Sequence, residues 1–197
     1  MTATAEHFGR RVAAGQDLVA GAGAIAAAAL AMAQRFHQGG KLIVFGTGGA
    51  ATDAQHVAVE FVHPVIVGKR ALPAICLTCD AATITGIAAR EGLEAIFAHQ
   101  IRYLAEPDDI AVGIWVDGPS PSVLTGLAAA RERGLLTIGL GGGGRAGRSA
   151  AAEHVLTAAT DDPRIAKEML VTTYHLLWEL VHVFFEQPGV LGPRVVT

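Results

Sequence analysis

The sequence predicts an α/β protein, a three-layer αβα sandwich on a five-stranded parallel sheet, preceded by an N-terminal helical segment. Two observations support this prediction. Short apolar runs alternate along the chain with segments of helical spacing, which is typical of right-handed βαβ crossovers and a parallel sheet. The runs are apolar throughout, as expected for strands that are buried on both faces. Ligands of such sheets bind beyond the carboxyl ends of the strands, so the loops there are where a site is expected.

The N-terminal part of the chain reads as helix. Alanine dominates from about Thr4 to His37, and apolar residues recur along this stretch, which predicts one long or broken helix. Gly21 and Gly23 either break this helix or allow close helix packing. The pair Gly39-Gly40 ends it.

The rest of the chain alternates between strands and helices. We expect strands at Leu42–Phe45, Pro73–Leu77, Ile110–Val116, Leu135–Leu140 and His154–Ala158. We expect helices at Thr52–His63, Ala81–Arg90, Glu94–Ala105, Ser120–Arg133 and Asp162–Phe185, the last with Pro163 in its first turn. The chain reads as a single domain over residues 1–197: a helical segment at 1–38, the core and last helix at 39–186, and an extended tail at 187–197.

The composition is that of a folded protein with subunit interfaces. The 197 residues suffice for one domain with a sizeable core. Apolar residues make up 51% and charged residues 17%, which argues against disorder and leaves more apolar surface than one small domain hides. We therefore expect a homo-oligomer. The net charge of −3, with scattered basic residues, gives no reason to expect nucleic acid as a partner.

Two cysteines, Cys76 and Cys79, lie in or at the end of an expected buried strand. A CxxC pair serves either as a redox centre or as half of a zinc site. Because a redox CxxC normally begins a helix and no second CxxC exists in this sequence, we favour buried, reduced thiols.

The expected location is cytoplasmic. The N-terminus lacks the basic-then-apolar order of a signal peptide. No uncharged run reaches the ~20 residues that a membrane span needs, so no membrane partner is expected.

The segment from Gly46 to Glu60, GTGGAATDAQHVAVE, is the most informative part of the chain. It takes the chain from an apolar run through a glycine-rich turn into a helix. Such a turn makes an anion site, because backbone N–H groups point outward and the helix dipole adds partial positive charge. His56 and Glu60 are four residues apart and share a helix face. They are either a surface pair or a proton-transfer or metal-binding pair acting on a small charged metabolite.

This segment resembles the first motif of SIS-domain proteins of the phosphoheptose isomerase type, which is close to GNGGS, two residues, then DAQHFAAEL. LPAICLTCD and the following Thr/Ile-rich helix resemble the family's second strand and helix. GIWVDGPSPSVLTGLAAARERGLLTIGL aligns with the family's phosphate-loop strand, helix and next strand. The last helix carries His175 where the family has its catalytic histidine. The resemblance covers nearly the whole chain.

The resemblance implies a SIS domain that assembles as a homotetramer, or sometimes a dimer, and isomerises sedoheptulose 7-phosphate or a related phosphosugar. A glutamate and a histidine shuttle protons in the family, which places the catalytic roles on Glu60 and His175. The family commonly holds zinc between two histidines, that glutamate and a glutamine. The implied ligands of one Zn²⁺ per subunit are His56, Glu60 and His175, and no nucleotide is implied. The implied substrate-binding residues are Thr47, Gly48, Gly49, Ala50, Asp117, Ser120 and Lys167.

The chain departs from the family's pattern at several of these positions. The family's glutamine falls on Lys167 after a one-residue gap, and a charged lysine is a poor zinc ligand. The asparagine and final serine of GNGGS are Thr47 and Ala50. The second phosphate loop, STSGNS in the family, reads WVDGPS here, so a single serine remains and Asp117 stands where a phosphate would lie. Two close anions repel by several kcal/mol at an effective dielectric of ~20. An Asn-Asp pair of the family is replaced by Ala89-Arg90.

These departures leave three functions open. The chain is an aldose–ketose isomerase, a non-catalytic SIS protein with an assembly or regulatory role, or a metal-binding relative with a neutral or cationic ligand. Lys167 either forms an ion pair with Glu60 that replaces the metal or stands beside a retained metal site.

Other polar and aromatic residues have simpler expected roles. We expect His182 to serve subunit packing, although it shares a helix face with His175. Trp115 and Trp178 are expected in the core or an interface. The run Gly141–Gly144 is either an anion site, with Arg145 and Arg148 nearby, or a flexible loop.

Overall fold

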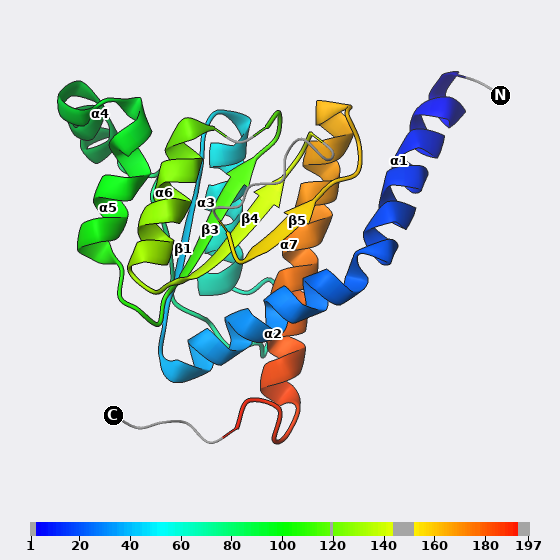
Figure 1. Cartoon of the computed structure of the whole chain (residues 1–197). Helices are drawn as coiled ribbons and strands as arrows, with labels where there is room; N and C mark the ends of the chain where they lie inside the picture. The colour runs from blue at the N-terminus through cyan, green and yellow to red at the C-terminus, as the bar shows by residue number, and fades with distance from the viewer. Residues whose placement is uncertain (1–2, 119, 144–151, 193–197) are drawn as a thin grey trace.

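Five parallel strands form one sheet in the computed structural model, which describes residues 3–118, 120–143 and 152–192. The strands are β1 (Leu42–Gly46), β2 (Ala74–Cys76), β3 (Ile110–Trp115), β4 (Leu136–Gly141) and β5 (His154–Thr157). They lie in the order β2-β1-β3-β4-β5, and every neighbouring pair is parallel. Their carboxyl ends therefore meet at one edge of the sheet (Figure 1). The predicted α/β fold is confirmed.

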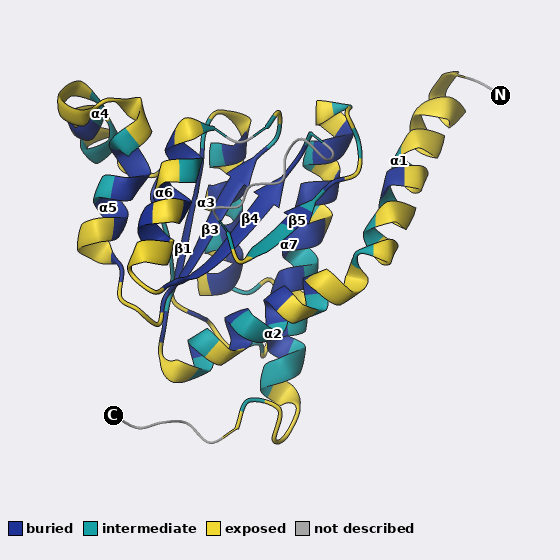
Figure 2. Ribbon diagram, viewed as in Figure 1, coloured by how far each residue is buried: buried dark blue, intermediate teal, exposed yellow. Residues whose placement is uncertain are grey.

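The sheet is buried on both faces along its middle strands. Every residue of β1, β3 and β4 is buried (Figure 2). Leu42 and Val44 pack into the core on one face of the sheet, while Ile43 and Phe45 pack into the core on the other. This double burial explains why these strands are continuous apolar runs rather than alternating sequences.

Helices form a layer on each face. The first layer contains α2 (Ala22–Gln38), α3 (Gly49–Val62) and α7 (Pro163–Glu186), whose apolar faces share one core cluster. The second contains α4 (Ala81–Glu91), the 3-10 turn η1 (Leu93–Ala95), α5 (Ile96–Leu104) and α6 (Pro121–Glu132). Helices α3 and α7 are in contact although more than a hundred residues separate them in sequence. This contact places the first motif of the resemblance, on α3, next to the last helix, which carries His175.

The N-terminal helix α1 (Ala3–Ala20) stands away from the sheet, at the right of Figure 1. It meets α2 at a bend of 62° at Gly21, so the helix is broken there, which was one of the open alternatives, while Gly23 lies inside α2. Gly39 ends α2 in a left-handed conformation, as expected. Among the described residues, no single helix is long and apolar enough to cross a membrane; the bent pair α1–α2 meets that test only when both helices are taken together, on length and composition alone.

Several boundaries differ from the prediction. Helix α3 begins at Gly49 rather than Thr52, because the glycine turn itself opens the helix. The first turn of the expected 94–105 helix is the separate turn η1. Residues 187–191 form turns and bends rather than an extended tail, and residues 193–197 lie outside the described part.

The expectation of two buried thiols is wrong for Cys79 and is only half met by Cys76. Strand β2 has only three residues and is half-buried. Cys76, its last residue, is half-buried, whereas Cys79 lies beyond the strand and is exposed. The apolar run from Pro73 to Leu77 predicted a buried strand of five residues. Strand β2 is shorter and half-buried, because it is at the edge of the sheet and lacks a neighbour on its outer side.

Candidate functional site

The turn between β1 and α3 is built around two glycines. A Cβ atom on Gly46 would lie 2.8 Å from the carbonyl oxygen of Ala50. Gly48 has φ +58° and ψ −126°, a conformation that side chains rarely allow. The amides of Ala50 and Ala51 donate to the carbonyls of Thr47 and Gly48. Among the described residues, no backbone carbonyl accepts from the amides of Gly48 and Gly49, so these two N–H groups remain for an anion.

One face of α3 carries three acidic or imidazole side chains toward α7. Asp53, His56 and Glu60 follow one another at spacings of three and four residues, so they line up along the helix. Asp53 and Glu60 are buried. Of the two alternatives left open for His56 and Glu60, the surface pair is therefore wrong for Glu60.

The facing side of α7 supplies a partner for each of these positions. Nζ of Lys167 lies 2.7 Å from Oδ2 of Asp53. The hydroxyl of Tyr174 lies 3.0 Å from Nδ1 of His56. The indole N–H of Trp178 donates to the backbone oxygen of Glu60 at 2.8 Å. These contacts fix how far α7 is shifted along the axis of α3.

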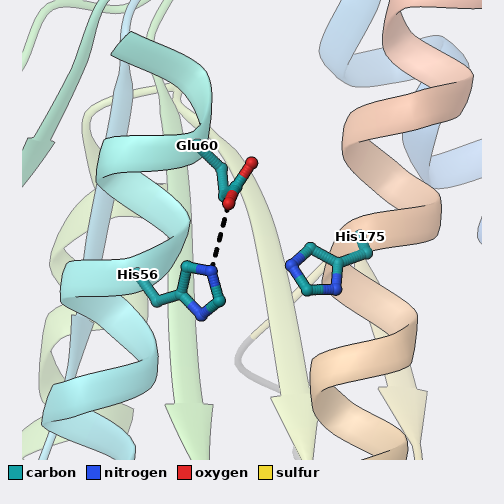
Figure 3. A group of neighbouring side chains, drawn as sticks. All are labelled: His56, Glu60 and His175. Atoms are coloured by element: carbon teal, nitrogen blue, oxygen red, sulfur yellow. Dashed lines mark hydrogen bonds and ion pairs between the residues drawn. The ribbon is translucent and has the colours of Figure 1, made fainter. Parts of the chain in front are cut away.

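The three residues named for catalysis and metal binding lie together (Figure 3). Nε2 of His56 is 3.1 Å from Oε1 of Glu60, and the ring of His175 approaches from α7 with its centroid 5.2 Å from that of His56. One ligand atom from each residue lies within 4.8 Å of the others. Among the described residues this is the one group of at least three such side chains. Two imidazoles and a carboxylate are a donor set that suits Zn²⁺ with one coordination position left open.

Lys167 does not lie where one of the expected alternatives puts it. Its ammonium contacts Asp53 and the carbonyl oxygen of Gly49, at 2.7 and 2.8 Å, rather than the side chain of Glu60. The ion pair with Glu60 that would replace a metal is therefore not formed, and the His56–Glu60–His175 group is left clear of the ammonium.

A cavity of about 430 Å³ opens at the carboxyl edge of the sheet, next to the first turns of α3 and α7, and the His56–Glu60–His175 group is not part of its lining. It is lined by Thr47, Gly48, Gly49, Ala50, Trp115, Val116, Asp117, Gly118, Pro163, Arg164 and Lys167. Six of the seven expected substrate-binding residues thus share one cavity. Ser120 does not: it lines an adjacent cavity of about 490 Å³, which also includes Thr47, and its hydroxyl lies 2.9 Å from that of Ser122.

Three residues of the site escaped the sequence analysis. Asp53 belongs to the recognised motif and precedes His56 by one helical turn, so its spacing could have revealed it. Tyr174 precedes His175 and reads as an ordinary core aromatic. Arg164 lies in the first turn of α7 and forms an ion pair with Asp162, the residue that caps this helix.

The surroundings of the site shift the pKa values of two residues, Tyr174 and Asp162. Burial, reinforced by the negative charges of Asp53 and Glu60, raises the pKa of Tyr174, so its hydroxyl stays protonated at neutral pH. Hydrogen bonds from Arg164 lower the pKa of Asp162, which keeps the cap of α7 ionised.

The expectation that His182 serves subunit packing is wrong, because His182 is buried within the chain itself. Its ring nitrogens lie 2.8 and 3.0 Å from the backbone oxygens of Trp178 and Arg70. Trp115 and Trp178 are buried, which confirms their expected place in the core. Strand β4 includes Gly141, but Gly144, Arg145 and Arg148 lie outside the described residues, so the anion site expected there stays a prediction.

Comparison with known proteins agrees with this architecture. The family model of the SIS domain matches residues 8–142 of the sequence. The phosphoheptose isomerase of Solidesulfovibrio magneticus is 41% identical over 172 residues, which cover 85% of this chain and 82% of that protein. The solved phosphoheptose isomerase of Francisella tularensis has a TM-score of 0.80 at 29% identity, covering 93% of this chain and all of that one. That of Neisseria gonorrhoeae has a TM-score of 0.78 at 28% identity, covering 90% and 96%.

Proposed function

The chain belongs to the SIS-domain family, among the phosphoheptose isomerases, and from this premise we propose that it isomerises sedoheptulose 7-phosphate or a closely related aldose–ketose sugar phosphate. The observation that carries the proposal is the meeting of Glu60 on α3 with His175 on α7, two helices whose first turns line a cavity at the carboxyl edge of the sheet. Two neighbouring groups able to exchange protons are what an aldose–ketose isomerisation requires.

Glu60 is the proposed base. Its carboxylate takes a proton from C1 or C2 of the opened sugar, and His175 gives or removes the proton on the other side. Oε1 of Glu60 is engaged by His56, and no hydrogen bond within the described residues occupies Oε2, which leaves that oxygen for the substrate. General acid–base catalysis of this kind contributes roughly 10²–10⁴-fold in rate.

We assign the phosphate of the sugar to the cavity at the carboxyl edge of the sheet. The free amides of Gly48 and Gly49 and the cations of Lys167 and Arg164 surround it. These groups replace the hydroxyls that the second loop lacks. Asp117 lines the same cavity, and its carboxylate suits a sugar hydroxyl better than a phosphate, so we assign it to the sugar.

We further propose that one Zn²⁺ per subunit binds His56, Glu60 and His175, without a nucleotide cofactor. When bound, such an ion polarises substrate oxygens as a Lewis acid. The donor set supports this, and so does the position of Lys167, whose ammonium is held away by Asp53.

The proposed assembly is a homo-oligomer, a tetramer by family resemblance. Helix α1 supports it, because Phe8, Val12 and Val19 expose 65%, 60% and 74% of their surface. A neighbouring subunit would cover these side chains. The single domain over residues 1–197 and the cytoplasmic location stay predictions from the sequence.

Turnover of sedoheptulose 7-phosphate by the purified chain tests the proposed activity. We expect wild-type protein to convert it, and Glu60→Gln to lose at least about 10²-fold in rate while keeping the fold by circular dichroism. Glu132→Gln, which changes an exposed glutamate of α6, is the matched control and should keep full activity. No turnover by wild-type protein would reject the isomerase and favour a non-catalytic SIS protein or a changed ligand.

A further inference from the structure

The two cysteines of this chain lie together in a tight turn at the carboxyl edge of the sheet, and the proposed reaction uses neither of them. Cys76 is the last residue of β2, and residues 77–79 turn the chain toward α4. The amide of Cys79 donates to the carbonyl oxygen of Cys76 across 3.4 Å, which closes this turn. The Cα atoms at the ends of such a turn lie within about 7 Å of each other, and a disulfide spans about 4.4–6.8 Å. The backbone therefore holds the two cysteines at a separation that an S–S bond can bridge.

The thiol groups of the pair also meet. Burial raises the pKa of the Cys76 thiol, hydrogen bonds with Thr78 oppose this shift, and a hydrogen bond with the Cys79 thiol adds to it. Cys76 is half-buried and keeps its proton at neutral pH, whereas Cys79 is exposed. When one thiol is open to solvent and its neighbour is shielded, the open thiol is oxidised first and the shielded one can resolve the product.

The position of the pair in the fold agrees with a redox role. Asp80, the residue after Cys79, caps α4 and accepts from the amides of Ala82 and Thr83. Three of the four residues of the CxxC sequence thus lie between β2 and α4, directly before a helix and not within a buried strand. Within the part of the chain that the structure describes, no histidine, cysteine or carboxylate completes a group of three metal ligands with the pair. The turn therefore presents a dithiol.

We propose that Cys76 and Cys79 are a reversible modification site, in which hydrogen peroxide oxidises the exposed Cys79 and Cys76 resolves the product as a disulfide within the chain. In the first step the Cys79 sulfur attacks peroxide. An S–O bond forms, the O–O bond breaks, and the released hydroxide leaves with the thiol proton as water. In the second step the Cys76 sulfur attacks the Cys79 sulfur. An S–S bond forms, the S–O bond of the sulfenic acid breaks, and hydroxide leaves with the Cys76 proton as a second water. The two thiols together lose two electrons, which reduce one peroxide to two waters.

The disulfide has two consequences for the protein. It protects Cys79, because a sulfenic acid without a resolving thiol is oxidised further to sulfinic acid, which thiols do not reduce. It also changes a contact of α3. Sγ of Cys76 lies 2.8 Å from the hydroxyl oxygen of Thr78, which lies 3.5 Å from the carbonyl oxygen of Ala51 in the first turn of α3. Oxidation moves the Cys76 sulfur from Thr78 to Cys79, beside the start of the helix that carries His56 and Glu60.

Intact-mass spectrometry of the reduced chain, treated in its folded state with a small molar excess of hydrogen peroxide, tests the proposal. We expect the wild-type protein to lose two hydrogen atoms and both free thiols at the mass of a single chain, and dithiothreitol to restore both thiols. The double variant Cys76→Ser/Cys79→Ser is the control, because a mass gain in it reports methionine oxidation alone. Two free thiols after this treatment, or a disulfide between two chains, would overturn the proposal whether or not the protein turns over a sugar.

Single variants test the role of each thiol. Dimedone labels sulfenic acids, and Cys76→Ser should be labelled at Cys79 at least about 10-fold more than wild-type protein, because no thiol consumes the intermediate. Cys79→Ser keeps only the half-buried thiol and should lose it at least about 10-fold more slowly than Cys76→Ser loses the exposed one. Equal labelling of wild-type protein and Cys76→Ser shows that Cys76 does not resolve the product, and faster oxidation of Cys79→Ser shows that Cys79 does not react first. Either result overturns the assigned roles.

Discussion

The ammonium of Lys167 and the carboxylate of Asp53 form an ion pair that joins α7 to α3, with Nζ and Oδ2 2.7 Å apart. The carboxylate is buried and the lysine is partly exposed. The same Nζ donates to the carbonyl oxygen of Gly49, at the start of α3. One side chain thus fixes the glycine turn, the buried acid and the first turns of α7 relative to one another, next to the His56–Glu60–His175 group.

Replacing the lysine should destabilise the protein. Lys167→Met leaves Asp53 buried without its partner, and we expect a loss of about 1–2 kcal/mol in the free energy of unfolding, limited because the lysine is partly solvated. Urea denaturation measures it. Adding Asp53→Asn to Lys167→Met should restore part of the loss, and an additive double variant would contradict a direct pair.

Metal content should follow the three ligands. Protein purified without a tag should carry about one Zn²⁺ per chain, and His56→Ala or His175→Ala should carry almost none. His99→Ala is the control, because His99 pairs with Glu91 on the surface of the second helix layer. Elemental analysis measures the zinc content per chain, and equal zinc content in wild-type protein and His56→Ala would contradict the proposed metal site.

The glycine turn should be sensitive to a single methyl group. Gly48→Ala forces an alanine into φ +58°, and we expect a loss of about 1–3 kcal/mol in stability. Gly86→Ala is the matched control: Gly86 lies inside α4 with open space around it, so alanine should stabilise by about 0.5–1 kcal/mol. If thermal unfolding shows that Gly48→Ala is as stable as the wild-type protein or more stable, the strained turn is contradicted.

Acid should weaken the start of α7. The hydrogen bonds from Arg164 lower the pKa of Asp162 below its ordinary value of 3.8, so this carboxylate stabilises the fold above pH 3.8 and loses its effect as the pH falls through the lower folded-state pKa. The wild type should be more stable than Asp162→Asn at pH 5, and the difference should shrink toward pH 2. Denaturation curves over this range test it, and a difference that grows on acidification would show that the sign is wrong.

The fold could be predicted from the sequence because its signals are local. Strands such as β3 are unbroken apolar runs, and the αβ alternation follows from them. His56 and Glu60 were found together because a spacing of four residues is itself a contact in a helix. The resemblance then placed His175 in the same site.

The partners across α3 and α7 could not be predicted in the same way. Whether Lys167 meets Glu60 or Asp53 depends on how far one helix is shifted along the other, and only packing sets that shift. Tyr174 carries no local signal, because an aromatic residue on an apolar helix reads as core. Cys79 was misplaced because the length of a strand at a sheet edge is not encoded in its apolar run alone.

The most direct test of the central claim, that side chains of α3 and α7 act as one isomerase site, is conversion of sedoheptulose 7-phosphate in D₂O followed by ¹H NMR. We predict conversion with deuterium entering at the carbon that loses its proton, and a rate at least about 10²-fold lower for both Glu60→Gln and His175→Ala. Wild-type rates in either variant, or no conversion by the unaltered chain, would contradict the account.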